Sequence, residues 1–405
     1  MELRIPVAEL SRALALAQGV VQRKNTMPIL AHVLLDASAR DGGRLTLSAT
    51  DLDVGVRTER ACEVTAPGAV TIPARALADM VRELPGPDVT LKRLPNQHVE
   101  VKSGRTRARL LALSADEFPS LPPYHEAAFV SLDTTLLVDM VDKTLYAASQ
   151  DETRYNLNGV LFEPPVSGGS GGNGGNGGNG GNGGGGDGPL TMVATDGHRL
   201  VRIERTFEGA SKFSLKSPVI LPRKGLGELR RILGEVLAEQ KGDKSADASS
   251  KTVELGFKDQ HAVLKRGNTI LGMRLVDGQF PDYKQVIPKL ADKIVRVARQ
   301  DIVDSLKRVS VLAQDRMQPV KLALTKDQLV VSCANPDAGE ISDDVPVEYA
   351  GQGIEVAFNA RYLIEALQSL DDKNVLLKLI DNLSPGLLVG VDEPRHLCVV
   401  MPMRL

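Results

Sequence analysis

Apolar residues recur every three or four positions in three separate stretches of the chain, which is the spacing of a helix with one buried face. The stretches are far apart and lie in similar local surroundings. We therefore predict three amphipathic helices that occupy equivalent places in three similar segments. Their apolar stripes are Leu10, Leu14, Ala17 and Val21, then Leu137, Met140, Val141 and Leu145, and finally Ile302, Val303, Leu306 and Val309.

A second pattern also occurs three times, as a strand-like apolar run, a turn and another helical stripe. It covers residues 70–85, 218–233 and 354–370. Internal repetition of this kind predicts a tandem array of similar structural units. The residues around the first copy of the pattern read as short strands, because apolar runs alternate with Gly, Asn, Asp and Pro. These strands are predicted at 45–49, 70–72, 89–92, 99–102 and 107–113.

The order helix, strands, helix, strands in each copy predicts an α+β fold, with two helices packed on an antiparallel sheet. A length of 405 residues suits three domains. We place their boundaries at 1–125, 126–287 and 288–405. The middle domain carries a Gly/Asn-rich insertion at 167–188, which we expect to be disordered, and a polar insertion at 241–250.

Composition limits the kind of core, the covalent and metal sites and the location that we expect for the chain. Aromatic residues make up 3% of the chain and Trp is absent, so the cores must be aliphatic. Cys62, Cys333 and Cys398 are scattered without CxxC spacing, which predicts neither disulfides nor a zinc site, and we expect no metal or cofactor. No run of 18 apolar residues occurs and the first residues lack the pattern of a signal peptide, so we expect a cytoplasmic protein.

The charges are arranged unevenly although the formal net charge is only −2. Arg105, Arg107 and Arg109 alternate along a candidate edge strand of the first copy, which would place them on one face. Acidic residues gather in the third copy, among them Glu340 and Asp343. A head-to-tail contact between two chains would pair these charges. The alternative is that both groups are ordinary solvated surface.

The segment 193–202, VATDGHRLVR, contains the residue types of acid–base chemistry in Asp196, His198 and Arg199. No nucleophile in a recognisable elbow, no HExxH pattern and no spaced carboxylate pair accompanies them. A Thr-Asp-Gly-His sequence after a strand is explained by a turn. We therefore predict no catalytic residues.

Seven short motifs together resemble one family along the whole chain. The motifs are NTMPIL at 25–30, SATDL at 48–52, RYNLNG at 154–159, ATDGHRL at 194–200, LPRKG at 221–225, LVDGQFPDY at 275–283 and the terminal VVMPMRL. Their order and spacing are similar to those of the bacterial DNA polymerase III beta subunits, the replicative sliding clamps.

The resemblance implies a function. It implies the DNA clamp fold, closed by a head-to-tail homodimer into a ring around duplex DNA, with helices lining the hole. Such a ring is a processivity factor and not an enzyme, and it needs no cofactor. The implied partners are double-stranded DNA of any sequence, a second copy of the chain, the polymerase III catalytic subunit, the clamp-loader complex, and other replication and repair polymerases that present short hydrophobic peptides.

The resemblance also implies three groups of site residues. The pocket for partner peptides would comprise Leu157, Thr195, Gly197, His198, Arg199, Leu200, Pro281, Val286, Met317, Asn359, Tyr362, Leu383, Val399, Val400, Met401, Pro402, Met403 and Arg404. DNA would contact Lys24, Arg75, Gln150, Tyr155, Arg223 and Lys224. To these we add the charges that interrupt the apolar stripes of the helices expected to face the hole, namely Arg12, Lys143, Arg230, Arg231, Lys307 and Arg308. The dimer interface would join Arg105, Arg107 and Leu110 to Val311, Leu312 and Glu340.

Two other functions remain open from the sequence. A three-domain scaffold could bind peptides in the same pocket without encircling DNA. A nucleotidyl-transfer enzyme would need a carboxylate pair that holds two metal ions, and the repeats supply no such pair.

Overall fold

The computed structural model describes residues 1–21, 27–122, 124–165, 188–215, 217–242, 251–313 and 319–404. These residues form two compact units. Unit one comprises Met1–Thr134, Lys212–Ser214 and Lys224–Leu275, and unit two comprises Thr135–Ser211, Leu215–Arg223 and Val276–Leu405. In the described ranges no helix has the length and apolar character needed to span a membrane.

Unit one contains an eight-stranded antiparallel sheet in the order β10-β15-β16-β17-β4-β3-β2-β6 and a five-stranded sheet in the order β5-β1-β7-β8-β9. Helices α1 (Val7–Val20) and α2 (Ala74–Arg82) pack together, and most of α4 (Arg223–Gly242) belongs to this unit. The strands are β1 (Glu2–Pro6), β2 (His32–Ser38), β3 (Arg44–Thr50), β4 (Val54–Ala61), β5 (Glu63–Ala66), β6 (Gly68–Pro73), β7 (Asp88–Arg93), β8 (His98–Ser103), β9 (Thr106–Leu111), β10 (Ala128–Asp133), β15 (Thr252–Lys258), β16 (His261–Arg266) and β17 (Thr269–Arg274).

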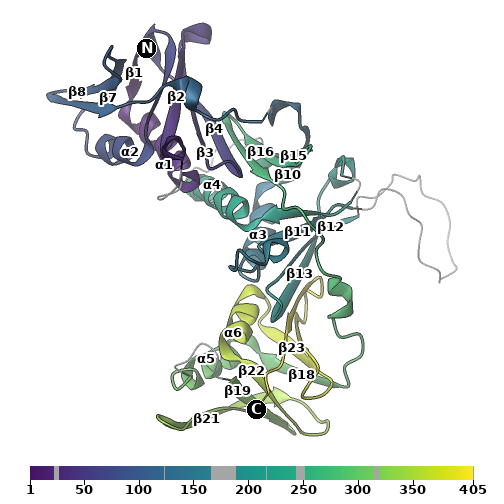
Figure 1. Ribbon diagram of the computed structural model, residues 1–405. Coiled ribbons are helices and arrows are strands. Elements are labelled where there is room, and N and C mark those ends of the chain that lie inside the picture. Colours follow the sequence, from purple (N-terminus) through teal and green to yellow (C-terminus); the bar gives the residue numbers. More distant parts are fainter. Residues whose placement is uncertain are drawn as a thin grey trace, which may run out of the picture. The chain divides into compact units, whose positions relative to one another are not determined.

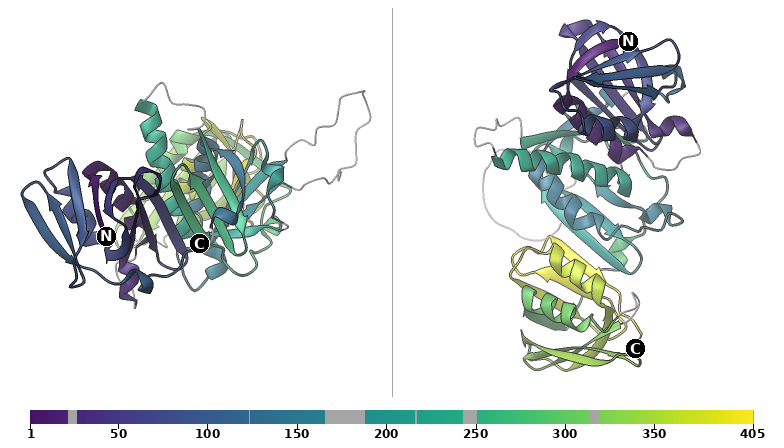
Figure 2. Two further views of the ribbon diagram at one scale, coloured as in Figure 1. Left: turned by 90° about the horizontal axis from the view of Figure 1, so that it is seen from above. Right: turned by 90° about the vertical axis from the view of Figure 1, so that its left-hand side faces the viewer.

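Unit two is built on a twelve-stranded sheet in the order β14-β11-β12-β13-β25-β24-β23-β18-β21-β20-β19-β22. Its helices are α3 (Thr134–Leu145), α5 (Arg299–Val309) and α6 (Ala360–Ser369), and α5 and α6 lie side by side on one face of the strands (Figures 1 and 2). The strands are β11 (Gly159–Glu163), β12 (Pro189–Thr195), β13 (Arg199–Thr206), β14 (Val219–Pro222), β18 (Lys293–Ala298), β19 (Pro319–Thr325), β20 (Gln328–Asn335), β21 (Gly339–Glu348), β22 (Ile354–Asn359), β23 (Asn374–Leu379), β24 (Gly386–Gly390) and β25 (His396–Val400).

The internal repetition is visible in the strand order. Read from β6, the large sheet of unit one runs β6-β2-β3-β4-β17-β16-β15-β10, and the first eight strands of unit two run β14-β11-β12-β13-β25-β24-β23-β18. Each of these sets of eight strands combines four strands from one copy with four from the next. The two groups of four join at β4 and β17 in unit one and at β13 and β25 in unit two. The predicted α+β class is therefore confirmed, whereas the predicted domain boundaries remain a prediction.

The three predicted helical stripes are confirmed as α1, α3 and α5, with small differences at their ends. Val21 lies one residue beyond α1, and Leu145 is half-buried at the end of α3. The predicted turn between strand and second helix is wrong, because β6 ends at Pro73 and α2 begins at Ala74. The proline ring holds φ of Pro73 near −54°, so the chain passes from strand to helix without a loop.

Aliphatic side chains fill the cores, as the composition predicts. The helix α5 buries Ile302, Val303, Leu306 and Val309 against the strands, all at most 2% exposed. The expected disorder of 167–188 falls, except for Gly188, outside the described residues, and α4 extends two residues into the polar insertion.

We expect Leu306→Ala to lower the free energy of unfolding of the part that contains it by about 2–5 kcal/mol, because Leu306 is fully buried and its removal leaves a cavity. Denaturant unfolding followed by circular dichroism measures the change. Leu290→Ala is the control, since Leu290 is 84% exposed; a loss of stability of the same size in both variants would contradict the assigned packing.

Candidate functional site

A small apolar cavity of about 140 Å³ lies in unit two, beside the pairing of β13 with β25. Its floor comes from Leu200 and Val399, which face each other across these two strands. The segment that follows β17 supplies one wall. The lining residues are Leu157, Thr195, Gly197, Arg199, Leu200, Pro281, Tyr283, Val286, Val399 and Met401.

The turn between β12 and β13 holds one edge of this cavity in place. The carboxylate Oδ1 of Asp196 accepts hydrogen bonds from the backbone N–H of His198 at 2.9 Å and of Arg199 at 3.0 Å. Gly197 has φ of +89°, a conformation in which glycine is favoured, and its N–H donates to Oγ1 of Thr195 at 3.1 Å. The Thr-Asp-Gly-His sequence is therefore a turn, as predicted, in which the aspartate has a structural role.

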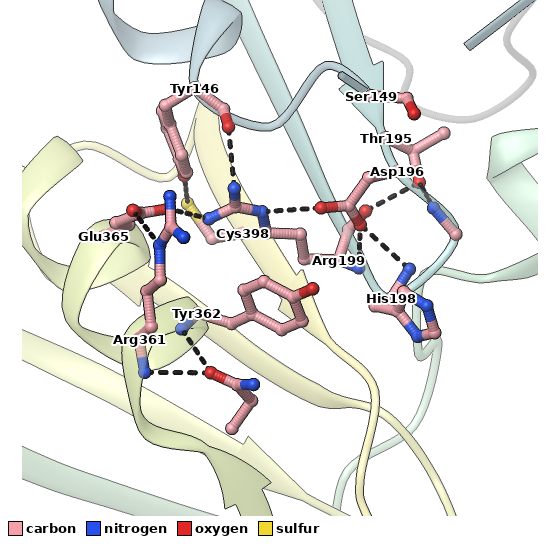
Figure 3. A network of polar contacts seen from close by, with 12 residues as sticks. Tyr146, Ser149, Thr195, Asp196, His198, Arg199, Arg361, Tyr362, Glu365 and Cys398 are labelled. Carbon is pink, nitrogen blue, oxygen red and sulfur yellow. Dashed lines mark hydrogen bonds and ion pairs between the residues drawn. The ribbon is translucent and has the colours of Figure 1, made fainter. Parts of the chain in front are cut away.

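Arg199 lies behind this turn with only 7% of its side chain exposed. Its Nε donates to Asp196 Oδ2 at 3.1 Å, its Nη1 pairs with Glu365, and its Nη2 donates to the carbonyl oxygen of Tyr146 at 2.7 Å (Figure 3). The guanidinium also lies 4.6 Å from the ring centroid of Tyr362. A buried charge is tolerated when it is paired and hydrogen-bonded in this way. Arg199 is consequently held rigid.

Glu365, on α6, is the second acid of this network. Burial acts to raise the pKa of the Glu365 carboxyl, but hydrogen bonds from Arg361 and Arg199 outweigh it, and the pKa is lowered. The carboxylate thus stays charged beside Arg199. Arg361 Nε donates to Glu365 Oε1 at 2.7 Å, which completes the chain of charges shown in Figure 3.

The rings of His198, in the turn between β12 and β13, and of Tyr362, in the first turn of α6, lie beside this network. His198 stacks on Tyr362 with 6.2 Å between ring centroids and 19° between the planes. Asn359 caps α6, since its Oδ1 accepts from the N–H of Arg361 at 3.0 Å and of Tyr362 at 3.3 Å. Asn359, a predicted pocket residue, therefore positions Tyr362 and does not line the cavity.

Nine predicted pocket residues line the cavity, and others lie elsewhere. Val400 is fully buried, and since side chains alternate along a strand its neighbour Val399 faces the cavity instead. Leu383 is 74% exposed in the loop after β23, and Met403 forms an isolated bridge with Ala357. Pro402 is half-buried and Arg404 is exposed. Met317 lies outside the described residues.

Tyr283 lines the cavity and was missed by the sequence reasoning. Its hydroxyl donates to Oε2 of Glu163 at 2.8 Å, and burial, followed by this hydrogen bond, raises the pKa of Tyr283. The phenol therefore stays neutral and its ring packs into the apolar cluster with Leu200 and Val399. The signal was present in the motif 275–283, which ends in this tyrosine.

The candidate DNA contacts differ in how exposed their side chains are and in whether their charges are already paired. Arg75 is exposed beside Asp79 at 3.6 Å, and Tyr155 is 61% exposed. Gln150 is exposed, Arg223 is half-buried at the start of α4, and Lys24 lies outside the described residues. The ammonium of Lys224 pairs with Asp51 and donates to the carbonyl oxygen of Val20 at 3.0 Å.

Among the charges that were added because they interrupt the helical stripes, the prediction that Lys143 contacts DNA is wrong, because this side chain is not free to face solvent. Its side chain is 8% exposed and pairs with Asp139 at 2.7 Å and with Asp371. Arg12 pairs with Glu9 at 2.8 Å. Arg231 pairs with Glu228 and Glu235, Arg308 with Asp343, and Arg230 and Lys307 lie on the same helices, α4 and α5.

Three of the candidate interface residues, Arg107, Leu110 and Glu340, lie on the strands β9 and β21, and the other three lie in turns. β9 is the last strand of the five-stranded sheet, as predicted, with Arg107 exposed and Leu110 half-buried. Arg105 lies in the turn before β9, so the predicted row of three strand arginines is wrong and comprises two. Glu340 is exposed on β21, Val311 is 69% exposed and Leu312 is half-buried after α5.

Comparisons with known proteins agree along the whole chain. Family models for the N-terminal, central and C-terminal domains of the DNA polymerase III beta subunit match residues 1–122, 185–282 and 284–404. The beta sliding clamp of Caulobacter vibrioides is 34% identical over 408 residues, and that of Pseudomonas aeruginosa is 33% identical over 406, each covering 100% of both chains.

Solved structures agree with this result. A crystal structure of the Caulobacter crescentus beta sliding clamp superposes with a TM-score of 0.86, at 34% identity, over 100% of this chain and 99% of that one. A sliding clamp from Bartonella birtlesii bound to griselimycin gives a TM-score of 0.85 at 31% identity, over 100% of both chains. The chain belongs to the DNA polymerase III beta subunit family, and it is a beta sliding clamp, a non-catalytic processivity factor of DNA replication.

Proposed function

We propose that the chain closes head to tail with a second copy into a ring around duplex DNA, and that it tethers its partners through the cavity beside β13 and β25. The three domains of this clamp are residues 1–125, 126–287 and 288–405. The ring acts in the cytoplasm on DNA of any sequence, together with the clamp loader, the polymerase III catalytic subunit and other polymerases. The observation that carries the peptide-binding role is the open apolar cavity over Leu200 and Val399.

The size and chemistry of the cavity favour one hydrophobic anchor of a peptide. A dry cavity of about 150 Å³ accepts a group the size of benzene, and this cavity measures about 140 Å³. Val286 and Met401 at its rim are both 37% exposed, so a ligand that covers them gains hydrophobic burial. The buried Arg199 supports the edge without filling the space.

Two sheet edges suit the proposed interface. Among the described strands, β9 is paired on one side only, with β8, and β21 pairs with β18 through Val347 and Glu348 alone. The rest of β21, including Glu340, therefore presents an open edge opposite its pairing with β20. Arg107 on one edge and Glu340 on the other have opposite charges. A heterologous contact that closes on itself gives a ring.

DNA binding in such a ring is a summed attraction to phosphates. Contacts to phosphates carry no sequence information directly, which permits sliding. Arg75, Gln150, Tyr155, Arg223 and Lys24 are the proposed contacts. Lys224 contributes less to this attraction because Asp51 already neutralises its charge.

Retention on DNA tests the ring directly. The protein, loaded by clamp loader and ATP onto nicked circular DNA, should stay bound during gel filtration and should be lost within minutes once the circle is linearised. Equal retention on circles and linear molecules would mean ordinary DNA binding. No retention with an active loader would favour the peptide scaffold.

Val286→Asp should weaken the binding of a short hydrophobic peptide from the polymerase III catalytic subunit by at least about tenfold, because the carboxylate would be buried without a partner under the anchor. Fluorescence anisotropy of the labelled peptide measures the affinity. Leu290→Asp is the matched control in the same loop, since Leu290 is 84% exposed. Unchanged affinity in Val286→Asp would show that the peptide binds elsewhere.

Arg107→Glu should shift the dimer towards monomers, measured by sedimentation at micromolar concentration, since like charges then meet across the interface. Combining it with Glu340→Lys should restore the dimer. If Arg107→Glu sediments as the unchanged dimer, the two edges do not meet through these charges.

A further inference from the structure

The pairing of β4 with β17 in unit one has the same plan as the pairing that forms the open cavity in unit two. Both pairs occupy the middle of sheets with equivalent strand order. In unit one Gly55 faces Gly272, and in unit two Leu200 faces Val399. Gly55 also pairs with Thr50 as Leu200 pairs with Thr195. The glycine pair is therefore the counterpart of the cavity floor.

The turns beside the two floors share their backbone hydrogen bonds. In unit one Asp51 Oδ1 accepts from the N–H of Asp53 at 3.1 Å and of Val54 at 2.7 Å, as Asp196 does in unit two. Leu52 has φ of +83° where Gly197 has +89°. The N–H of Arg274 donates to Asp53 O at 2.7 Å, and that of Met401 to His198 O at 2.9 Å. Unit one thus keeps the frame of the cavity.

The difference lies in what occupies the space over the floor. A Cβ added at Gly272 would overlap Cζ, Cε1 and Oη of Tyr124, and one added at Gly55 would lie 2.9 Å from Oη of Tyr124 and 2.9 Å from Cδ2 of Leu121. The ring of Tyr124 therefore lies directly on the glycine pair. It is 6% exposed and packs with Ala127 and Val263.

Tyr124 reaches this place from the segment equivalent to the cavity wall. Each wall segment begins with a Phe-Pro pair, at 118–119 and at 280–281. Leu121 follows the first pair as Tyr283 follows the second, and three residues later stand Tyr124 and Val286. Val286 is 37% exposed and leaves the cavity open, whereas the longer Tyr124 side chain fills the equivalent space.

We propose that the β4·β17 floor is a second anchor pocket of the clamp, closed by the chain's own Tyr124, and that the group it takes is a phenol or similar aromatic side chain. The likeness to a peptide pocket rests on the proposed function of the open cavity. One consequence is that, of these two equivalent floors, the one in unit two is open and the one in unit one is filled. Burial, followed by the charge of Asp51, raises the pKa of Tyr124 to about 12, so the occupant is neutral.

Removal and replacement of the phenol test this proposal on the full chain. Tyr124→Gly deletes the occupant, and p-cresol, which is the tyrosine side chain cut at Cα, is the probe. At ten times its dissociation constant p-cresol should raise the thermal unfolding midpoint of the variant by about 2–4 °C, and that of wild type not at all. Tyr124→Gly with Gly272→Val should lose the response, because the floor then fills the space.

The absence of a p-cresol effect on Tyr124→Gly, or an equal effect on wild type, would overturn the proposal. A second measurement keeps the tyrosine. Gly272→Ala should displace Tyr124 and accelerate chymotrypsin cleavage after it by at least about tenfold, whereas Gly227→Ala, where an added Cβ meets no atom within 4 Å, should not.

Two results in Gly272→Ala would also overturn the proposal: unchanged protection of Tyr124 from chymotrypsin, or equally rapid cleavage after the buried Tyr349. The first would mean that Tyr124 is not displaced, and the second that the chain unfolds as a whole. Neither assay uses a partner peptide or DNA. A failure here therefore leaves the open cavity's role intact, and a failure of the Val286→Asp test would not alter the p-cresol result.

Discussion

The antiparallel pairing of β13 with β25 is the contact on which the functional site depends. It brings Arg199 to Val400 and Leu200 to Val399, about 200 residues apart in the chain, within one sheet. The N–H of Met401 continues the pairing to the carbonyl of His198. Because side chains alternate along a strand, this register sends Leu200 and Val399 to the same face. A shift of one residue would replace the cavity floor with core side chains.

Arg199 complements this backbone pairing with charge. Its guanidinium pairs with Asp196 in the turn after β12 and with Glu365 on helix α6. Two elements from different copies are thereby held at a fixed distance from each other. Removal of one partner from a buried ion pair leaves an unpaired charge, which is costly. The rim of the cavity is thereby preorganised, which reduces the ordering cost that a peptide would meet on binding.

The sequence predicts the repeats and the helical stripes because periodicity records them directly, and most of the cavity lining is implied by the resemblance of its motifs to the DNA polymerase III beta subunits. It does not predict which charges have partners. Lys143 interrupts an apolar stripe as a solvent-facing lysine would, yet it is buried between Asp139 and Asp371, and Asp371 is 228 residues away. Lys224 is similar, since Asp51 lies in a distant turn. Only the tertiary fold shows these partners.

The two sheets show how one frame can hold an open or a filled site. The two sheets differ in where the large side chains stand. Unit two has Leu200 and Val399 in the floor and the short Val286 in the wall, whereas unit one has glycine at both floor positions and the large Tyr124 above them. Native packing tolerates neither overlap nor a large void. A glycine pair beneath a small wall residue would leave a deep void, and a bulky pair beneath tyrosine would clash. Floor and wall are therefore matched in size in each sheet.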